Sequence, residues 1–107
     1  MQEFEKLYDT IMERRENPQE GSYTCYLFDQ GLDKMLKKLG EECAETIIAC
    51  KNRSRREVVG ELTDMAFHAA VLMAHLDILP QDISNELALR AQKAGNLKQF
   101  RVVDKNT

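Results

Sequence analysis

The stretch KKLGEECAETIIACKNRSRREVVGELTDMAFHAAVLM, residues 37–73, decides the fold because it places two acidic clusters in two apolar segments. The acidic residues are Glu41, Glu42, Glu45, Glu61 and Asp64. Side chains three and four residues apart point from the same side of a helix. Each segment is therefore predicted to form a helix that carries its carboxylates on one face.

The turn between the two predicted helices brings these carboxylates together. Residues 52–54 form a tight connection, so the helices run antiparallel and the acids meet near the closed end of a hairpin. Such a cluster repels itself unless a hard divalent cation lies inside it. Mg²⁺ prefers oxygen ligands and commonly holds phosphates, and Mn²⁺ is expected to substitute for it. The sequence thus predicts a metal site that activates water for attack on a phosphoanhydride.

A charged surface and a di-iron site are the alternatives to a magnesium site. An acidic cluster on a helix is often only a solvated face that pairs with lysines. For Glu41 alone, this interpretation and a role in the metal site fit the sequence equally well. A di-iron site needs a histidine three residues after a glutamate, but Asp64 stands in that place after Glu61. His68 lies on the same stripe as Asp64 and is expected to be a core histidine more than a ligand.

Hydrophobic periodicity predicts an all-α fold. Helices are expected at about residues 3–16, 31–51, 54–77, and from Pro80 to Gly95-Asn96. Residues 22–28 are rich in aromatic and β-branched side chains, and we interpret them as an extended segment or a short helical turn. The prediction is a four-helix bundle in a single domain of residues 1–96, followed by a loosely ordered tail of residues 97–107.

A homodimer is predicted from the amount of apolar surface. The helix at 54–77 is apolar almost all round and needs cover on every side. The helix at 31–51 carries an apolar stripe made of Leu32, Met35, Leu36, Leu39, Cys43, Ile47 and Cys50. Because a chain of 107 residues buries only a small core, a second copy is expected to complete the bundle.

Composition excludes several classes of protein. A net charge of −3 argues against a nucleic-acid-binding module. The most apolar segment, residues 58–79, contains acids and histidines, so a membrane span is not expected. The amino terminus has no signal-peptide pattern, and the three cysteines lack zinc-ligand spacing. We therefore expect a cytoplasmic protein.

Residues 22–52, SYTCYLFDQGLDKMLKKLGEECAETIIACKN, together with ELTDMAFHAAVLM at 61–73, resemble the phosphoribosyl-ATP pyrophosphatase family. This family is part of the MazG-like all-α nucleoside triphosphate pyrophosphatases. The resemblance implies Mg²⁺-dependent hydrolysis of phosphoribosyl-ATP to phosphoribosyl-AMP and pyrophosphate, the second step of histidine biosynthesis. Water, not a protein nucleophile, would attack between the α and β phosphates.

The resemblance also implies roles for individual residues. Metal-binding and catalytic roles fall on Glu42, Glu45, Glu61 and Asp64, with Glu41 as a nearby acid or occasional ligand. Substrate-binding roles near the phosphates or ribose groups fall on Ser22, Tyr23, Thr24, Lys34, Lys37 and Lys38. Phe67 stands where the family usually has tyrosine, and Gly60 replaces a common acid, so substrate fit can differ.

Two alternative functions remain open at this point. One keeps the chemistry but changes the substrate to noncanonical or deoxynucleoside triphosphates. The other is a helical interaction module whose acids are only a charged surface, which predicts no magnesium binding.

Overall fold

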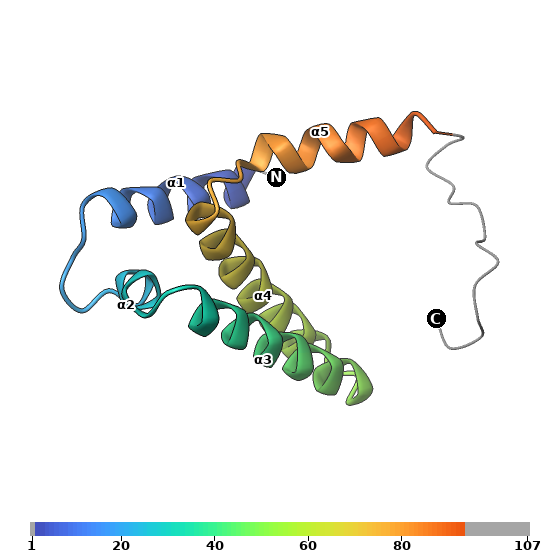
Figure 1. The fold of residues 1–107 in the computed structure, drawn as a ribbon. Coiled ribbons are helices and arrows are strands. Elements are labelled where there is room, and N and C mark those ends of the chain that lie inside the picture. The colour runs from blue at the N-terminus through green and yellow to red at the C-terminus, as the bar shows by residue number, and fades with distance from the viewer. Residues whose placement is uncertain (1, 94–107) are drawn as a thin grey trace.

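The computed structural model describes residues 2–93, which are helical wherever they are regular (Figure 1). The elements are α1 (Gln2–Glu16), α2 (Tyr23–Gln30), α3 (Leu32–Lys51), α4 (Arg55–His75) and α5 (Pro80–Ala91). The all-α prediction is confirmed, but the expected four helices are five within the described range. The predicted helix end at Gly95-Asn96, the domain boundary at 96 and the tail at 97–107 lie outside the described residues.

The additional helix, α2, arises from capping and burial that outweigh its local composition. The Ser22 hydroxyl accepts the backbone N–H of Cys25 at 3.2 Å, as an N-cap residue does. Leu27 is fully buried in the core, so packing holds the segment helical despite its aromatic residues. Gly31 ends α2 with a φ of 89°, which a glycine adopts without strain. The aromatic side chains of this segment are therefore presented from a helix.

Helices α3 and α4 form the predicted antiparallel hairpin and make the most extensive helix–helix contact of the described chain (Figure 1). Asn52 ends α3, and the Ser54 hydroxyl accepts the backbone N–H of Glu57 to begin α4. Between the helices, the Thr46 hydroxyl lies 3.1 Å from the Met65 sulfur. These contacts fix the register in which the acidic residues of the two helices face one another.

The hydrophobic core lies at the open end of this hairpin. It is built from α1, α2, the start of α3 and the end of α4, and its buried members are Tyr8, Ile11, Leu27, Met35, Ala70, Val71 and Ala74. The Tyr8 hydroxyl donates to the Ile78 carbonyl at 2.8 Å, and the Arg15 guanidinium donates to the Ala74 carbonyl. These bonds hold α1 against the end of α4.

The apolar stripe predicted for α3 lies mainly on the outside of the chain. Met35 is buried, but Leu32, Leu36 and Ile47 are 38%, 46% and 61% exposed. Cys43 and Cys50, which belong to the same stripe, are exposed too. The register explains the difference, because α3 turns its acidic side, not this stripe, toward α4.

Helix α5 extends away from the other four helices and exposes Ile83 and Leu87 (Figure 1). Within residues 2–93, no single helix combines the length and the apolarity needed to cross a membrane. Only α4 and α5 taken together reach those limits, and they are bent by 106° at their junction.

Candidate metal centre

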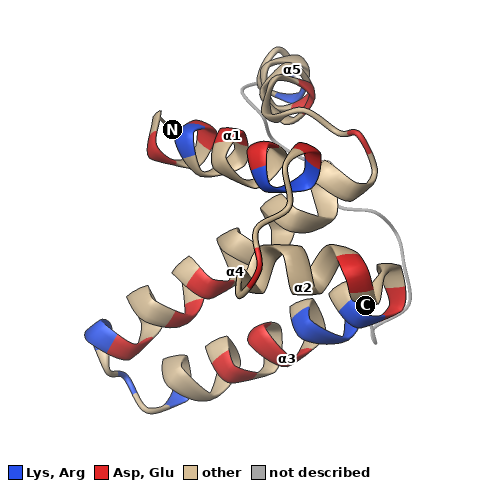
Figure 2. Cartoon of the chain, turned by 90° about the vertical axis from the view of Figure 1, so that its left-hand side faces the viewer, with Lys and Arg blue, Asp and Glu red and all other residues tan. Residues whose placement is uncertain are grey.

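Three of the five acidic residues converge between α3 and α4. Glu42 and Glu45 reach the space from α3, and Glu61 reaches it from α4. One carboxylate oxygen of each lies within 4.8 Å of those of the other two. Figure 2 shows acidic residues of α3 alongside those of α4, with basic residues nearer the start of α3. We refer to Glu42, Glu45 and Glu61 as the carboxylate triad.

Two oxygens of the carboxylate triad are buried without a hydrogen-bond partner. They are Oε2 of Glu42 and Oε2 of Glu61. A buried carboxylate oxygen without a donor is unfavourable, since it has lost water and gained nothing in exchange. A cation placed between the three carboxylates would satisfy both atoms. The donor set consists of oxygen alone, which suits Mg²⁺ or Mn²⁺ better than zinc.

The environment raises the pKa values of Glu61 and Glu42. Burial raises the pKa of Glu61 to about 7, and the adjacent carboxyl groups of Glu45 and Glu42 act in the same direction. Burial also raises the pKa of Glu42, with the negative charge of Glu45 adding to the effect. Without a cation, the site therefore holds protons at pH values where an ordinary carboxylic acid is ionised.

Asp64 and Glu41 lie outside the triad. Asp64 is exposed on α4, although the apolar character of that helix had suggested a buried position. Its negative charge still contributes to the raised pKa of Glu42, so it lies near the site. Glu41 is exposed on α3 and pairs with Lys38 at 3.7 Å. The structure thus brings three of the expected acids together, and leaves Asp64 beside them and Glu41 on the rim.

His68 is the buried polar neighbour of the triad. Its Nε2 atom lies 4.0 Å from Oε1 of Glu42, and its side chain is only 7% exposed. Burial lowers the pKa of His68, while the charge of Asp64 opposes that shift. This buried position agrees with the expectation that His68 is a core histidine.

The residues expected to bind substrate lie at the open end of the hairpin. Ser22 caps α2, Tyr23 is half-exposed and Thr24 is half-buried. On α3, Lys34 and Lys38 are half-buried, whereas Lys37 is exposed. Lys34, Lys38 and Glu42 are four residues apart, so they follow one face of the helix. This face presents positive charge at one end and the carboxylate triad at the other.

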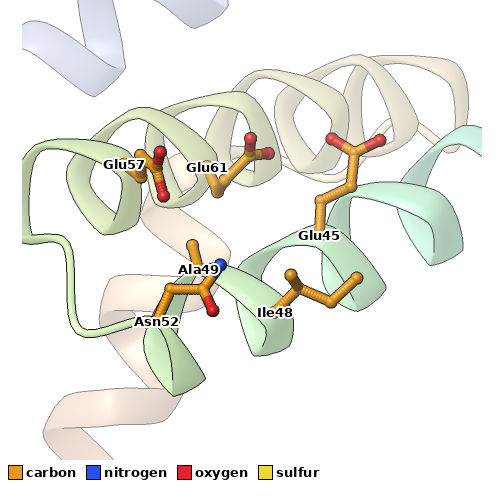
Figure 3. Close-up of a pocket in the computed structure, with 6 residues that line it drawn as sticks. All are labelled: Glu45, Ile48, Ala49, Asn52, Glu57 and Glu61. Atoms are coloured by element: carbon orange, nitrogen blue, oxygen red, sulfur yellow. The ribbon is translucent and has the colours of Figure 1, made fainter.

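A cavity of about 260 Å³ opens beside the triad toward the closed end of the hairpin (Figure 3). It is lined by Glu45, Ile48, Ala49, Asn52, Glu57 and Glu61. In Figure 3, Glu45 on α3 and Glu61 on α4 point toward the same space. Sequence reasoning did not identify Asn52 or Glu57 as residues that line this cavity. Glu57 precedes Glu61 by four residues, and that spacing could have revealed its place in the cavity wall, outside the triad.

Comparison with known proteins gives a consistent family. Residues 4–91 match the family described as phosphoribosyl-ATP pyrophosphohydrolase. A phosphoribosyl-ATP pyrophosphatase from Clostridium novyi is 46% identical over 97 residues, covering 91% of this chain and 88% of that protein. One from Bacillus cereus is 48% identical over 101 residues, covering 94% of each. A histidine biosynthesis bifunctional protein from Caldanaerobacter subterraneus is 51% identical over 88 residues, which span 82% of this chain and 43% of that protein.

Proposed function

The chain belongs to the phosphoribosyl-ATP pyrophosphohydrolase family, and on that premise we propose that its carboxylate triad is the magnesium site of the enzyme. The enzyme hydrolyses phosphoribosyl-ATP to phosphoribosyl-AMP and pyrophosphate in histidine biosynthesis. The observation that carries the proposal is the pair of buried, unpartnered oxygens on Glu42 and Glu61. A cation is the simplest partner for both.

Glu42, Glu45 and Glu61 would hold Mg²⁺, or Mn²⁺ in its place, with Asp64 as the fourth carboxylate. When bound, the ion supplies charge neutralisation for the phosphates and an activated water. The two helices fix the carboxylates before substrate arrives, because their register is set by the turn at residues 52–54. His68 lies buried beside Glu42 on the α4 side. Glu41, through its pair with Lys38, would help to orient that lysine.

Basic residues next to the triad supply the positive charge that a polyphosphate needs. Lys34 and Lys38 lie on the same face of α3 as Glu42. Their ammonium groups would neutralise phosphate oxygens during cleavage and stabilise the departing pyrophosphate. Lys37, which is exposed, would act only at the entrance, and Ser22 and Thr24 would approach the substrate from the start of α2.

A second copy of the chain would cover the hairpin. Apolar residues on the outer face of α3 and on α5 are exposed, because a hairpin of two helices does not bury them by itself. Packing α3 and α4 against the same pair of helices from a second chain would complete a four-helix bundle. We propose this homodimer as the active form, in the cytoplasm, with no nucleic-acid or membrane partner.

The proposed function is tested by incubating the purified protein with phosphoribosyl-ATP and measuring pyrophosphate release. We expect release with Mg²⁺, comparable release with Mn²⁺, and none after chelation with EDTA. Deoxynucleoside triphosphates serve as the competing substrates. Turnover of those compounds, with no action on phosphoribosyl-ATP, would reject phosphoribosyl-ATP as the substrate. Full activity in EDTA would reject the metal site.

Magnesium affinity is expected to depend on pH because of Glu61. Binding requires the ionised carboxylate, and the pKa of Glu61 is raised to about 7. Below that pH each unit should weaken binding roughly tenfold, and above it the affinity should level off. Titration calorimetry at pH 6, 7 and 8 measures this, and use of several buffers detects the released proton. An affinity unchanged between pH 6 and 8 would contradict the prediction.

A further inference from the structure

A cluster of aromatic side chains joins α2 to α4 beside the triad. The Tyr23 ring stacks with Tyr26 and with Phe67, at centroid distances of 5.9 and 6.0 Å and interplanar angles of 21° and 25°. The Tyr23 and His68 rings are perpendicular, with an interplanar angle of 89° and centroids 5.9 Å apart. Because His68 is also the neighbour of Glu42, this buried side chain links the aromatic cluster to the carboxylate triad.

The two tyrosines of this cluster are more exposed than core packing explains. Tyr23 is 46% exposed and Tyr26 is 43% exposed, whereas Tyr8 is buried and donates to the Ile78 carbonyl. A cavity of about 550 Å³ opens beside Tyr23 and Tyr26 along the loop that precedes α2. Exposed aromatic rings beside an open cavity provide a flat surface on which a planar ring can stack.

The order of groups along α3 matches the order of groups in a nucleotide. The Lys34 ammonium lies 6.0 Å from the centroid of the Tyr26 ring, so the aromatic cluster adjoins the first lysine. Lys38 and then Glu42 follow at intervals of four residues, which places Glu42 about 12 Å along the helix from Lys34. Reading along this face of α3 from its start, the Tyr26 ring comes first, the two lysines follow, and the carboxylate triad comes last.

We propose that Tyr23 and Tyr26 form the platform that stacks the adenine base of phosphoribosyl-ATP. The inference rests on the proposed function, because it takes the triad as the metal site and the lysines as the phosphate-binding groups. With the phosphates beside Lys34 and Lys38, a base at the other end of the nucleotide reaches the tyrosine rings. The platform recognises the π face of the base, and it does not touch the reacting phosphorus. Tyr23 and Tyr26 are thus binding residues and are not catalytic.

The test compares leucine and phenylalanine variants at each tyrosine. Tyr26→Leu keeps an apolar side chain but removes the ring, and stacking with a base contributes enough that KM should rise roughly 5- to 150-fold. The value of kcat should stay within about threefold, because binding is lost equally from substrate and transition state. Tyr26→Phe keeps the ring and should bring KM back toward the native value. Tyr23→Leu and Tyr23→Phe repeat the comparison independently, and circular dichroism melts identify any variant that fails to fold.

The outcomes separate this inference from the proposed function. Native enzyme that releases no pyrophosphate from phosphoribosyl-ATP rejects the function itself. Native activity together with an unchanged KM in a folded leucine variant rejects the platform alone. A fall in kcat without a change in KM, or a phenylalanine variant as impaired as the leucine variant, also rejects it, since neither result fits loss of stacking.

Discussion

Replacing Glu61 with glutamine is expected to lower kcat/KM for phosphoribosyl-ATP by at least about 100-fold at saturating Mg²⁺. Mutating a residue that only supports a metal ligand typically lowers metal affinity or activity by about 10- to 100-fold. Glu61 belongs to the triad itself, so a larger effect is expected. Glutamine keeps the shape of the side chain but removes its negative charge. Steady-state pyrophosphate release measures the effect, and calorimetry should show weaker magnesium binding in the same variant.

Glu57→Gln is the matched control for this experiment. Glu57 lines the same cavity from the same helix and loses the same charge, but it lies outside the carboxylate triad. Its activity should stay within about threefold of native. Asp64→Asn then tests the fourth carboxylate, which is exposed and beside the triad. A large loss in that variant would support the predicted four-carboxylate site, and a small one would restrict the metal ligands to the triad.

The stability of the Glu61→Gln variant distinguishes lost catalysis from lost folding. Because the pKa of Glu61 is raised from 4.5 to about 7, its contribution to metal-free stability is present below pH 4.5 and is lost as pH rises through 7. Removing the charge should therefore leave the metal-free variant at least as stable as native protein at pH 8. An active Glu61→Gln enzyme would remove the basis for the metal site.

The convergence of the triad was predictable because it depends on local rules. Helical spacing places Glu42 and Glu45 on one side of α3, and the short turn at residues 52–54 forces α4 to return antiparallel. The exposure of Asp64 was not predictable from the apolar character of its helix. Composition gives the average environment of a helix, whereas the environment of one residue depends on which neighbours cover its face.

The helical conformation of α2 was not predictable from its local composition. Its aromatic and β-branched residues favour an extended segment locally, but burial of Leu27 against α1 and α4 selects the helix. The Ser22 cap and Gly31 stop were visible in the sequence and could have indicated both ends. The aromatic cluster could not be predicted from the sequence, because it depends on how α2 packs on α4 and not on spacing within either helix.

The outer face of α3 was correctly predicted as apolar, but the sequence did not show which element would cover it. Periodicity shows that Leu36, Cys43 and Ile47 share a face, and it does not show what that face contacts. Within the described chain, α4 takes the neighbouring face that carries Glu42 and Ala49. The exposed stripe is thus the surface on which a homodimer can be tested.

Ile47→Lys is expected to convert the protein from a dimer to a monomer at micromolar concentration. Ile47 is 61% exposed in one chain, and its position about 140° round α3 from Glu42 turns it away from α4. A lysine there would place two like charges in the symmetric interface and leave them desolvated. Sedimentation equilibrium measures the mass, and pyrophosphate release should fall with it if the dimer is the active form.

The same substitution gives a different result if the chain acts alone. An exposed isoleucine on a monomer can be replaced at a cost within about 0.5 kcal/mol, so mass, melting temperature and activity would all stay at native values. Thr10→Lys, which adds the same charge to an exposed position of α1, controls for the change in net charge and should leave the dimer intact. A native protein that already sediments as one chain would show that the apolar stripe serves another partner. A dimer unaffected by Ile47→Lys would place the interface elsewhere, with the exposed residues of α5 as the next surface to test.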